Sequence, residues 1–212
     1  MRKVMLGAIG VIFGLSVLMA QQPSCKMCPG THIPNTEVQA YIERAKQFGL
    51  TDQQIRQVDI GKTNFAVGVV HRGKLDKPGA ASVAEHDLVS ELYHVIDGSA
   101  TLMLGPDILN MERRPATQET VRLYNGPGNN GTTIRNGVSY DLKAGDVVII
   151  PAGTGHWFTK IDDHITYLMV RVDPEKVTPH KTEADSAADL KTNGRNTAGG
   201  GAGAAPNSRT GR

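Results

Sequence analysis

From Asn64 onward the chain alternates between short apolar runs and turn residues, a pattern that predicts β-strands. The runs are rich in β-branched and aromatic side chains and are too short for typical helices. They span residues 65–70, 92–96, 101–104, 147–150 and 165–172. Asp97-Gly98 and Asn136-Gly137 lie between runs and suit turns that need a positive φ. Many short strands with such turns indicate a β-sandwich or a jelly-roll barrel.

Apolar positions at helical spacing precede this region. These positions are Val38, Tyr41, Ile42, Ala45 and Phe48. They predict a helix that Asn35 or Thr36 can cap at its start and Gly49 can end. A second short helix is predicted directly afterwards, because Thr51 and Gln54 have the spacing of a capping box. We expect both helices to cover the outside of the β-domain or to contact a partner subunit.

The first twenty residues have the plan of a secretory signal peptide. Arg2 and Lys3 precede an apolar run at residues 4–18, and polar residues follow Ala20. The run is short for a membrane span, with an uncleaved N-terminal anchor as the alternative. We therefore expect residues 1–20 to be removed and the mature protein to be periplasmic or secreted, with no membrane attachment after cleavage.

The remaining chain divides into three parts. Residues 21–63 are expected to form a cysteine-containing segment with the helical extension, and residues 64–177 the β-domain. Within that domain, segment 105–131 is rich in Pro, Gly and Asn and is predicted to be mostly a long loop, which is usually functional or disordered. Residues 178–212 are rich in small and polar side chains and are predicted to be a disordered tail.

The balance of charge gives no indication of a nucleic-acid partner. Removing Arg2 and Lys3 from the 23 Lys and Arg residues leaves 21, which equals the 21 Asp and Glu residues. No run of basic residues forms a charged face, so the expected partner is a small molecule.

Cys25 and Cys28 are the only cysteines. In an oxidising compartment such a close pair can form a local disulfide, and a redox or metal-binding role is the alternative. Haem attachment would need a histidine where Pro29 stands, and a zinc site would need a second pair.

The strongest chemical signal surrounds His156. Gly145 opens a turn, four aliphatic residues follow, and Pro151 and Gly153 force a second turn that directs His156 into an enclosed space. This segment resembles the second motif of the cupin superfamily, Gly-x5-Pro-x-Gly-x2-His-x3-Asn. Lys160 stands in place of the final Asn.

An earlier segment resembles the first motif of the same superfamily, His-x-His-x3-4-Glu-x6-Gly. His86, Glu91 and Gly98 fit this motif, whereas Ala84 stands at its first histidine. An alternative alignment makes His86 the first histidine, but it places Leu88 at the second and leaves two residues before Glu91. We prefer the first alignment, in which one metal ligand is missing.

The resemblance implies an all-β fold: a cupin-type jelly-roll β-barrel, with the short helical extension and the disordered tail at its ends. It also implies a homodimer and a metal site made of His86, Glu91 and His156. Two imidazoles and one carboxylate suit one divalent transition metal ion, with Mn, Fe, Ni, Cu and Zn all open, and leave positions for water, substrate or O₂. Ordinary turn, ion-pair and barrel-mouth roles for the three residues are the alternative.

Side-chain alternation adds candidates for the pocket. Tyr93 shares the face of Glu91 and is a candidate catalytic hydroxyl, while Phe158 shares the face of His156 and would line a substrate pocket. Core packing is the alternative for both. If its strand lines the interior, His71 would also line the substrate pocket and could supply the missing ligand. Two functions follow: a metal-dependent enzyme of oxygenase, isomerase or lyase type, or a non-catalytic cupin that binds a sugar or an organic acid.

Overall fold

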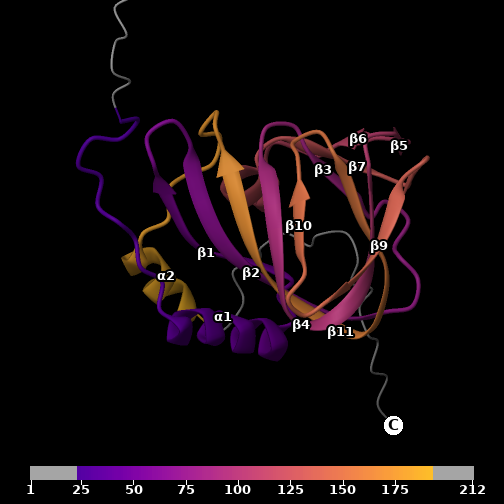
Figure 1. The fold of residues 1–212 in the computed structure, drawn as a ribbon, viewed down its shortest axis with the longest axis horizontal. Coiled ribbons are helices and arrows are strands. Elements are labelled where there is room, and N and C mark those ends of the chain that lie inside the picture. The colour runs from indigo at the N-terminus through magenta and orange to yellow at the C-terminus, as the bar shows by residue number, and fades with distance from the viewer. Residues whose placement is uncertain (1–22, 193–212) are drawn as a thin grey trace, which may run out of the picture.

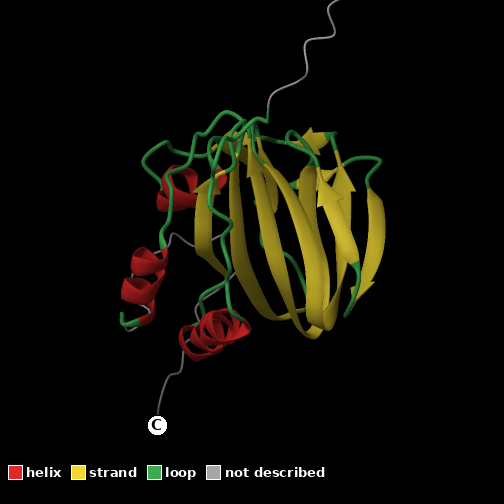
Figure 2. Ribbon diagram, turned by 60° about the vertical axis from the view of Figure 1, so that its left-hand side comes forward, coloured by secondary structure: helices red, strands yellow, loops and turns green. Residues whose placement is uncertain are grey.

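The computed structural model describes residues 23–192, which form a β-barrel with two helices on one flank (Figures 1 and 2). The expected signal peptide at residues 1–20 lies outside the described residues, as do residues 193–212 of the predicted disordered tail. No helix in the described part of the chain is long and apolar enough to cross a membrane.

Nine strands join in one antiparallel sheet system, and a second sheet has two. The strands are β1 (Asp52–Asp59), β2 (Asn64–Leu75), β3 (Val83–His86), β4 (Ser90–Gly105), β5 (Ile108–Leu109), β6 (Glu112–Arg113), β7 (Gly128–Gly131), β8 (Thr133–Ile134), β9 (Val138–Lys143), β10 (Val147–Ile150) and β11 (Gly155–Asp173). The all-β jelly-roll architecture predicted from the short apolar runs is confirmed.

Strands β4 and β11 are the two longest strands of the barrel. They pair along most of their length, and their register shifts at several points between Phe158 and Tyr167. The first half of β4 also pairs with β10 and the second half with β9, while β11 also pairs with β2 and β3. Each long strand therefore belongs to two sheet segments, which face each other across the core (Figure 2).

The core follows the alternation seen in the sequence. Tyr93 and Val95 of β4 are buried and His94 between them is exposed, as expected for a strand with one face inward. The main apolar cluster includes these residues together with Leu102, Phe158 and others from β2, β9, β10 and β11. Complete burial of a side chain such as Leu102 contributes about 1.5–3 kcal/mol to folding.

Helix α1 (Asn35–Phe48) is the first of the two helices predicted from the sequence. It ends at Gly49, which has the left-handed φ of 66° that the pattern required. Its N-cap is Pro34, so neither Asn35 nor Thr36 caps it with a side chain. Tyr41 and Ile42 pack against the outer face of β1 and β2.

The second predicted helix is wrong, because residues 52–59 form β1 instead. This strand pairs with β2, and five consecutive residues of it are buried. Ile55 faces α1, whereas the amide of Gln54 bonds to Gln57 and Arg171 on the other side. Pairing with a neighbouring strand outweighs the local capping signal of Thr51 and Gln54.

The prediction of disorder from residue 178 onward is wrong for residues 178–192, which are packed. Helix α2 (Glu183–Leu190) starts with a capping box between Thr182 and Asp185. Before it, Lys181 and Gln57 exchange two backbone hydrogen bonds of 3.1 Å. The polar residues that suggested disorder find their partners in β1 and α1, a long-range effect invisible in local composition.

Segment 105–131 is partly ordered rather than one long loop. It contains β5, β6, β7 and a single π-helical turn, η1 (Val121–Asn125). Strand β7 pairs with β3, so the segment lies directly beside His86.

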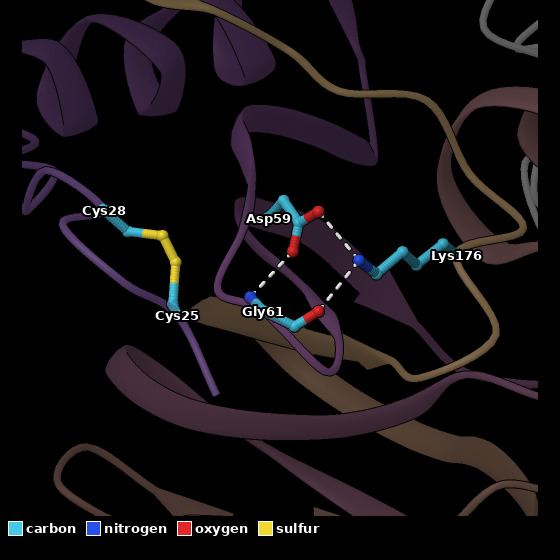
Figure 3. Close-up of a disulfide and its surroundings, with 5 residues drawn as sticks. All are labelled: Cys25, Cys28, Asp59, Gly61 and Lys176. Carbon is cyan, nitrogen blue, oxygen red and sulfur yellow. Dashed lines mark hydrogen bonds and ion pairs between the residues drawn. A yellow bond between two sulfur atoms is a disulfide. The ribbon is translucent and has the colours of Figure 1, made fainter. Parts of the chain in front are cut away.

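The N-terminal segment carries the disulfide between Cys25 and Cys28 (Figure 3). It lies against the turn after β1, where Lys176 donates hydrogen bonds to Asp59 (2.7 Å) and to the Gly61 carbonyl (2.9 Å). Gly61 has a φ of 102°, and a Cβ added there would overlap the backbone carbonyl of Ser24.

Gly61→Ala is therefore expected to destabilise the fold by about 1–3 kcal/mol, through backbone strain and displacement of the disulfide segment. Urea unfolding measures the change. Gly73→Ala is the matched control, because Gly73 has no positive φ and open space around its Cα. Equal stability of the two variants would contradict the packing described for Gly61.

Candidate metal centre

Three strands bring the predicted ligands together. His86 ends β3, Glu91 follows the first residue of β4, and His156 follows the first residue of β11. One donor atom from each lies within 4.8 Å of the others, and all three residues are buried. His86 Nε2 is 3.4 Å from Glu91 Oε1, and His156 Nε2 is 3.7 Å from Glu91 Oε2.

The motif glycines explain how the sequence builds this geometry. Gly98, Gly145 and Gly153 have φ values of 79°, 93° and 80°, which favour glycine. A Cβ at Gly98 would also overlap the carbonyl oxygen of His164. The N–H of Gly153 donates to the His86 carbonyl at 2.8 Å, so the turn of the second motif holds the histidine of the first.

Glu91 is a buried carboxylate with several partners. Arg171 Nε donates to its Oε1 at 3.0 Å and the Tyr93 hydroxyl to its Oε2 at 2.8 Å. Burial alone would raise the pKa of Glu91, but the neighbouring His86 and Arg171 hold this pKa well below its usual range. The carboxylate is therefore ionised and ready to act as a ligand.

His156 is held in its neutral form. Burial lowers the pKa of His156 to about 4, against the opposing attraction of Glu91. A neutral imidazole at pH 7 keeps the lone pair that a metal ion needs. Burial and the Glu91 charge also raise the pKa of Tyr93, so its hydroxyl stays protonated and donates to Glu91.

The donor set fits a divalent transition metal ion. Two imidazoles and one ionised carboxylate are the ligands that such ions prefer. The separations of 3.4 and 3.7 Å lie within the span of two ligand bonds of about 2.0–2.2 Å. Arg171 and Tyr93 orient the carboxylate from behind, as outer partners of metal ligands do.

Arg114 is a residue of the candidate site that the sequence did not reveal. It follows β6, and its Nη2 donates to the Glu85 carbonyl at 2.6 Å and lies 2.8 Å from His86 Nδ1. Nothing in the local sequence marks it, because the contact joins residues 28 positions apart. Ala84, at the place of the missing histidine, pairs through its backbone with His156.

His71 does not supply the missing ligand. Its Nδ1 lies 2.8 Å from the Thr166 hydroxyl and its ring is 5.8 Å from that of His164. It follows Val70, which points into the core, so the alternation of β2 turns His71 to the outer face. The prediction that His71 lines the substrate pocket is not supported by this placement.

Phe158 and Tyr93 lie as the alternation predicted, beside the ligands and facing inward. Their rings stack with centroids 6.5 Å apart, and Tyr167 lies 4.3 Å from Tyr93. The guanidinium of Arg72 lies over Phe158 at 5.0 Å. This aromatic group belongs to the main core, so Phe158 packs there.

A cavity of about 300 Å³ lies beyond Arg171, on the side of α1 and η1. Its walls include Asp52 and Gln54. Both accept hydrogen bonds from Arg171, Asp52 at 2.6 Å and Gln54 at 3.1 Å. Arg171 thus connects Glu91 with the wall of the cavity.

A scan against family models finds no match, and a search of curated proteins finds none either. Among solved structures, a Bacillus halodurans protein is 16% identical over 76% of this chain and 96% of its own, with a TM-score of 0.39. A cupin protein from Bacteroides fragilis is 15% identical over 55% of this chain and 72% of its own, with a TM-score of 0.33. A DMSP lyase structure is 22% identical over 56% of this chain, with a TM-score of 0.34. This chain spans 43% of that structure's length.

No substrate or activity follows from similarity of this degree. The class is defined by the molecule itself: an antiparallel jelly-roll barrel in which both motif segments meet around His86, Glu91 and His156. The chain therefore has the fold of the cupin superfamily, as its motifs predicted.

Proposed function

We propose that this protein binds one divalent transition metal ion through His86, Glu91 and His156 and catalyses a reaction of oxygenase, isomerase or lyase type on a small molecule. The observation that carries the proposal is the buried, convergent donor set with its ionised carboxylate and neutral His156. A bound ion would supply Lewis acidity or a site for O₂. The protonated hydroxyl of Tyr93 donates a hydrogen bond to Glu91 and orients that carboxylate.

Metal analysis of the purified protein tests the proposal. The parent protein, incubated with Mn, Fe, Ni, Cu or Zn and then desalted, is expected to retain about one equivalent of at least one of them. His86→Ala and His156→Ala each remove one of three ligands, and a weakening of at least 10–100-fold is expected, because loss of outer partners alone costs that much.

His94→Ala is the matched control, because this histidine lies on β4 near Glu91 but is exposed on the opposite face. It is expected to retain the metal. A parent protein that holds none of the five ions would overturn the proposal.

The second candidate function is non-catalytic binding of an organic acid or a sugar in the same barrel. The absent histidine at Ala84 and the guanidinium of Arg114 against His86 favour it. A ligand that raises the melting temperature equally in metal-free and metal-loaded protein would support this function. Turnover that requires the metal would exclude it.

We also propose that the protein is exported and forms a homodimer. The Cys25–Cys28 disulfide supports an oxidising compartment. The dimer is supported by exposed apolar side chains on β9 and β10, which are Val138, Tyr140, Val147 and Ile149.

A further inference from the structure

Arg114 is a buried guanidinium without an ionic partner in the described part of the chain. It is 7% exposed, and within residues 23–192 no carboxylate forms an ion pair with it. Arg56 and Arg171 are buried to a similar degree, and each pairs with a carboxylate. Arg44 has no ion pair within these residues either, but its two terminal nitrogens bond to the side chains of Gln53 and Thr192. Buried charges are almost always paired, so this arrangement calls for an explanation.

The hydrogen bonds of Arg114 leave part of its donor capacity unused. Nη2 makes both contacts, to the Glu85 carbonyl and to His86 Nδ1. The buried Nε has no hydrogen-bond partner. Position 128 is a glycine because a Cβ there would overlap this guanidinium and the Glu85 carbonyl. The packing thus holds the guanidinium close to the ligand histidine.

The hydrogen bond between Arg114 and His86 would be lost if the opposite nitrogen of His86 held a metal ion. Nε2 of His86 faces Glu91, at 3.4 Å, and Nδ1 faces Arg114, at 2.8 Å. A neutral imidazole has one N–H, so if Nε2 held an ion the hydrogen would be on Nδ1. Two donors would then face each other, and Arg114 would keep only the neutral Glu85 carbonyl as acceptor.

Once the Arg114 guanidinium no longer bonds to His86, an anionic oxygen group is the acceptor that would bind it most strongly. The planar fork of an arginine matches the two oxygens of a carboxylate, and charge-assisted bonds of this kind are roughly twice as strong as neutral ones. A sugar, which carries no charge, would form only neutral hydrogen bonds with this guanidinium. The enclosed position favours a small molecule.

We infer that the substrate class of this site is a small carboxylic acid, and that Arg114 anchors its carboxylate beside the metal centre. This inference rests on the proposed function, since it is an ion on His86 that frees Arg114. Arg114 acts on the substrate and not on the metal, so its loss should affect carboxylate binding more than metal content.

Calorimetric titration of the metal-loaded protein tests the inference. Acetate, propionate and malonate are the probes, and acetamide and propionamide are their uncharged counterparts. The parent protein is expected to bind at least one carboxylate and neither amide. Arg114→Gln is expected to weaken carboxylate binding at least tenfold. Arg114→Lys keeps the positive charge but not the planar guanidinium. Its affinity for carboxylates is expected to lie between those of the parent and Arg114→Gln.

Arg113→Gln is the matched control, because Arg113 precedes Arg114 in the chain but is exposed and pairs with Asp87. It is expected to bind the probes like the parent. Melting temperature and metal content, measured for every variant, separate loss of fold or metal from loss of the anchor. Equal carboxylate binding by the parent and Arg114→Gln would overturn the inference, as would amides that bind as well as carboxylates or a parent that binds no carboxylate.

The metal content of the parent keeps the two proposals distinct. A parent without metal contradicts the proposed function. Carboxylate binding that still depends on Arg114 in that protein would support the ligand class but contradict the release of Arg114 by a metal ion. Absence of such binding would overturn the ligand class too.

Discussion

Replacing Arg171 with methionine is expected to destabilise the folded protein by about 3–5 kcal/mol. Arg171 is 2% exposed and bonds to Glu91 and Asp52 through different nitrogens of one guanidinium. Its removal leaves the ionised Glu91 in the barrel without its permanent cationic partner, and Asp52 without its ion pair. Methionine fills much of the space but supplies no charge.

Urea unfolding of metal-free protein measures this effect. Arg135→Met is the control, because Arg135 forms an exposed ion pair with Asp107, and such pairs contribute about 0–1 kcal/mol. Adding Glu91→Gln to Arg171→Met should restore part of the loss, since it removes the uncompensated charge. A loss below about 1 kcal/mol for Arg171→Met would show that the ion pairs contribute little.

Acid is expected to weaken the metal-free fold mainly between pH 6.5 and pH 4, because of His156. The pKa of His156 is about 4 in the folded protein, while an unfolded histidine has a pKa of about 6.5. In this window His156 binds a proton in the unfolded chain but not in the folded chain, so the free energy of unfolding falls as the pH falls. The difference in pKa corresponds to about 3 kcal/mol.

Unfolding in urea at a series of pH values from 7.5 to 4 measures this dependence. His156→Gln removes the titrating group and should flatten the curve over that window. His94→Gln alters an exposed histidine on the same barrel and should leave the curve unchanged. Parallel curves for the parent and His156→Gln would mean that the burial of His156 does not control the acid response.

The sequence could predict the candidate site wherever the signal was local. The spacing of Gly145, Pro151 and Gly153 reflects turns that must place His156, and the structure contains those turns. Strand alternation placed Tyr93 and Phe158 on the inner face, where they lie. These features depend on residues a few positions apart, so their pattern is visible in the chain.

The features that escaped prediction depend on distant contacts. Residues 52–59 carry a capping signal, yet pairing with β2 makes them a strand. Arg114 reaches His86 only because β7 brings segment 105–131 beside β3. The packing of Lys181 on Gln57 joins residues more than a hundred positions apart, and no local composition can indicate it.

The packed residues after Thr178 have a consequence for the behaviour of the chain in solution. Strand β1 ends the path of paired strands, so one of its sides would present unpaired backbone groups. Lys181 and Ser186 occupy that side, bonding to the carbonyls of Gln54, Ile55 and Gln57. Open strand edges are templates for pairing between molecules. The C-terminal segment therefore covers this edge. A chain shortened at residue 177 would expose it to pairing with other molecules and is expected to aggregate more readily.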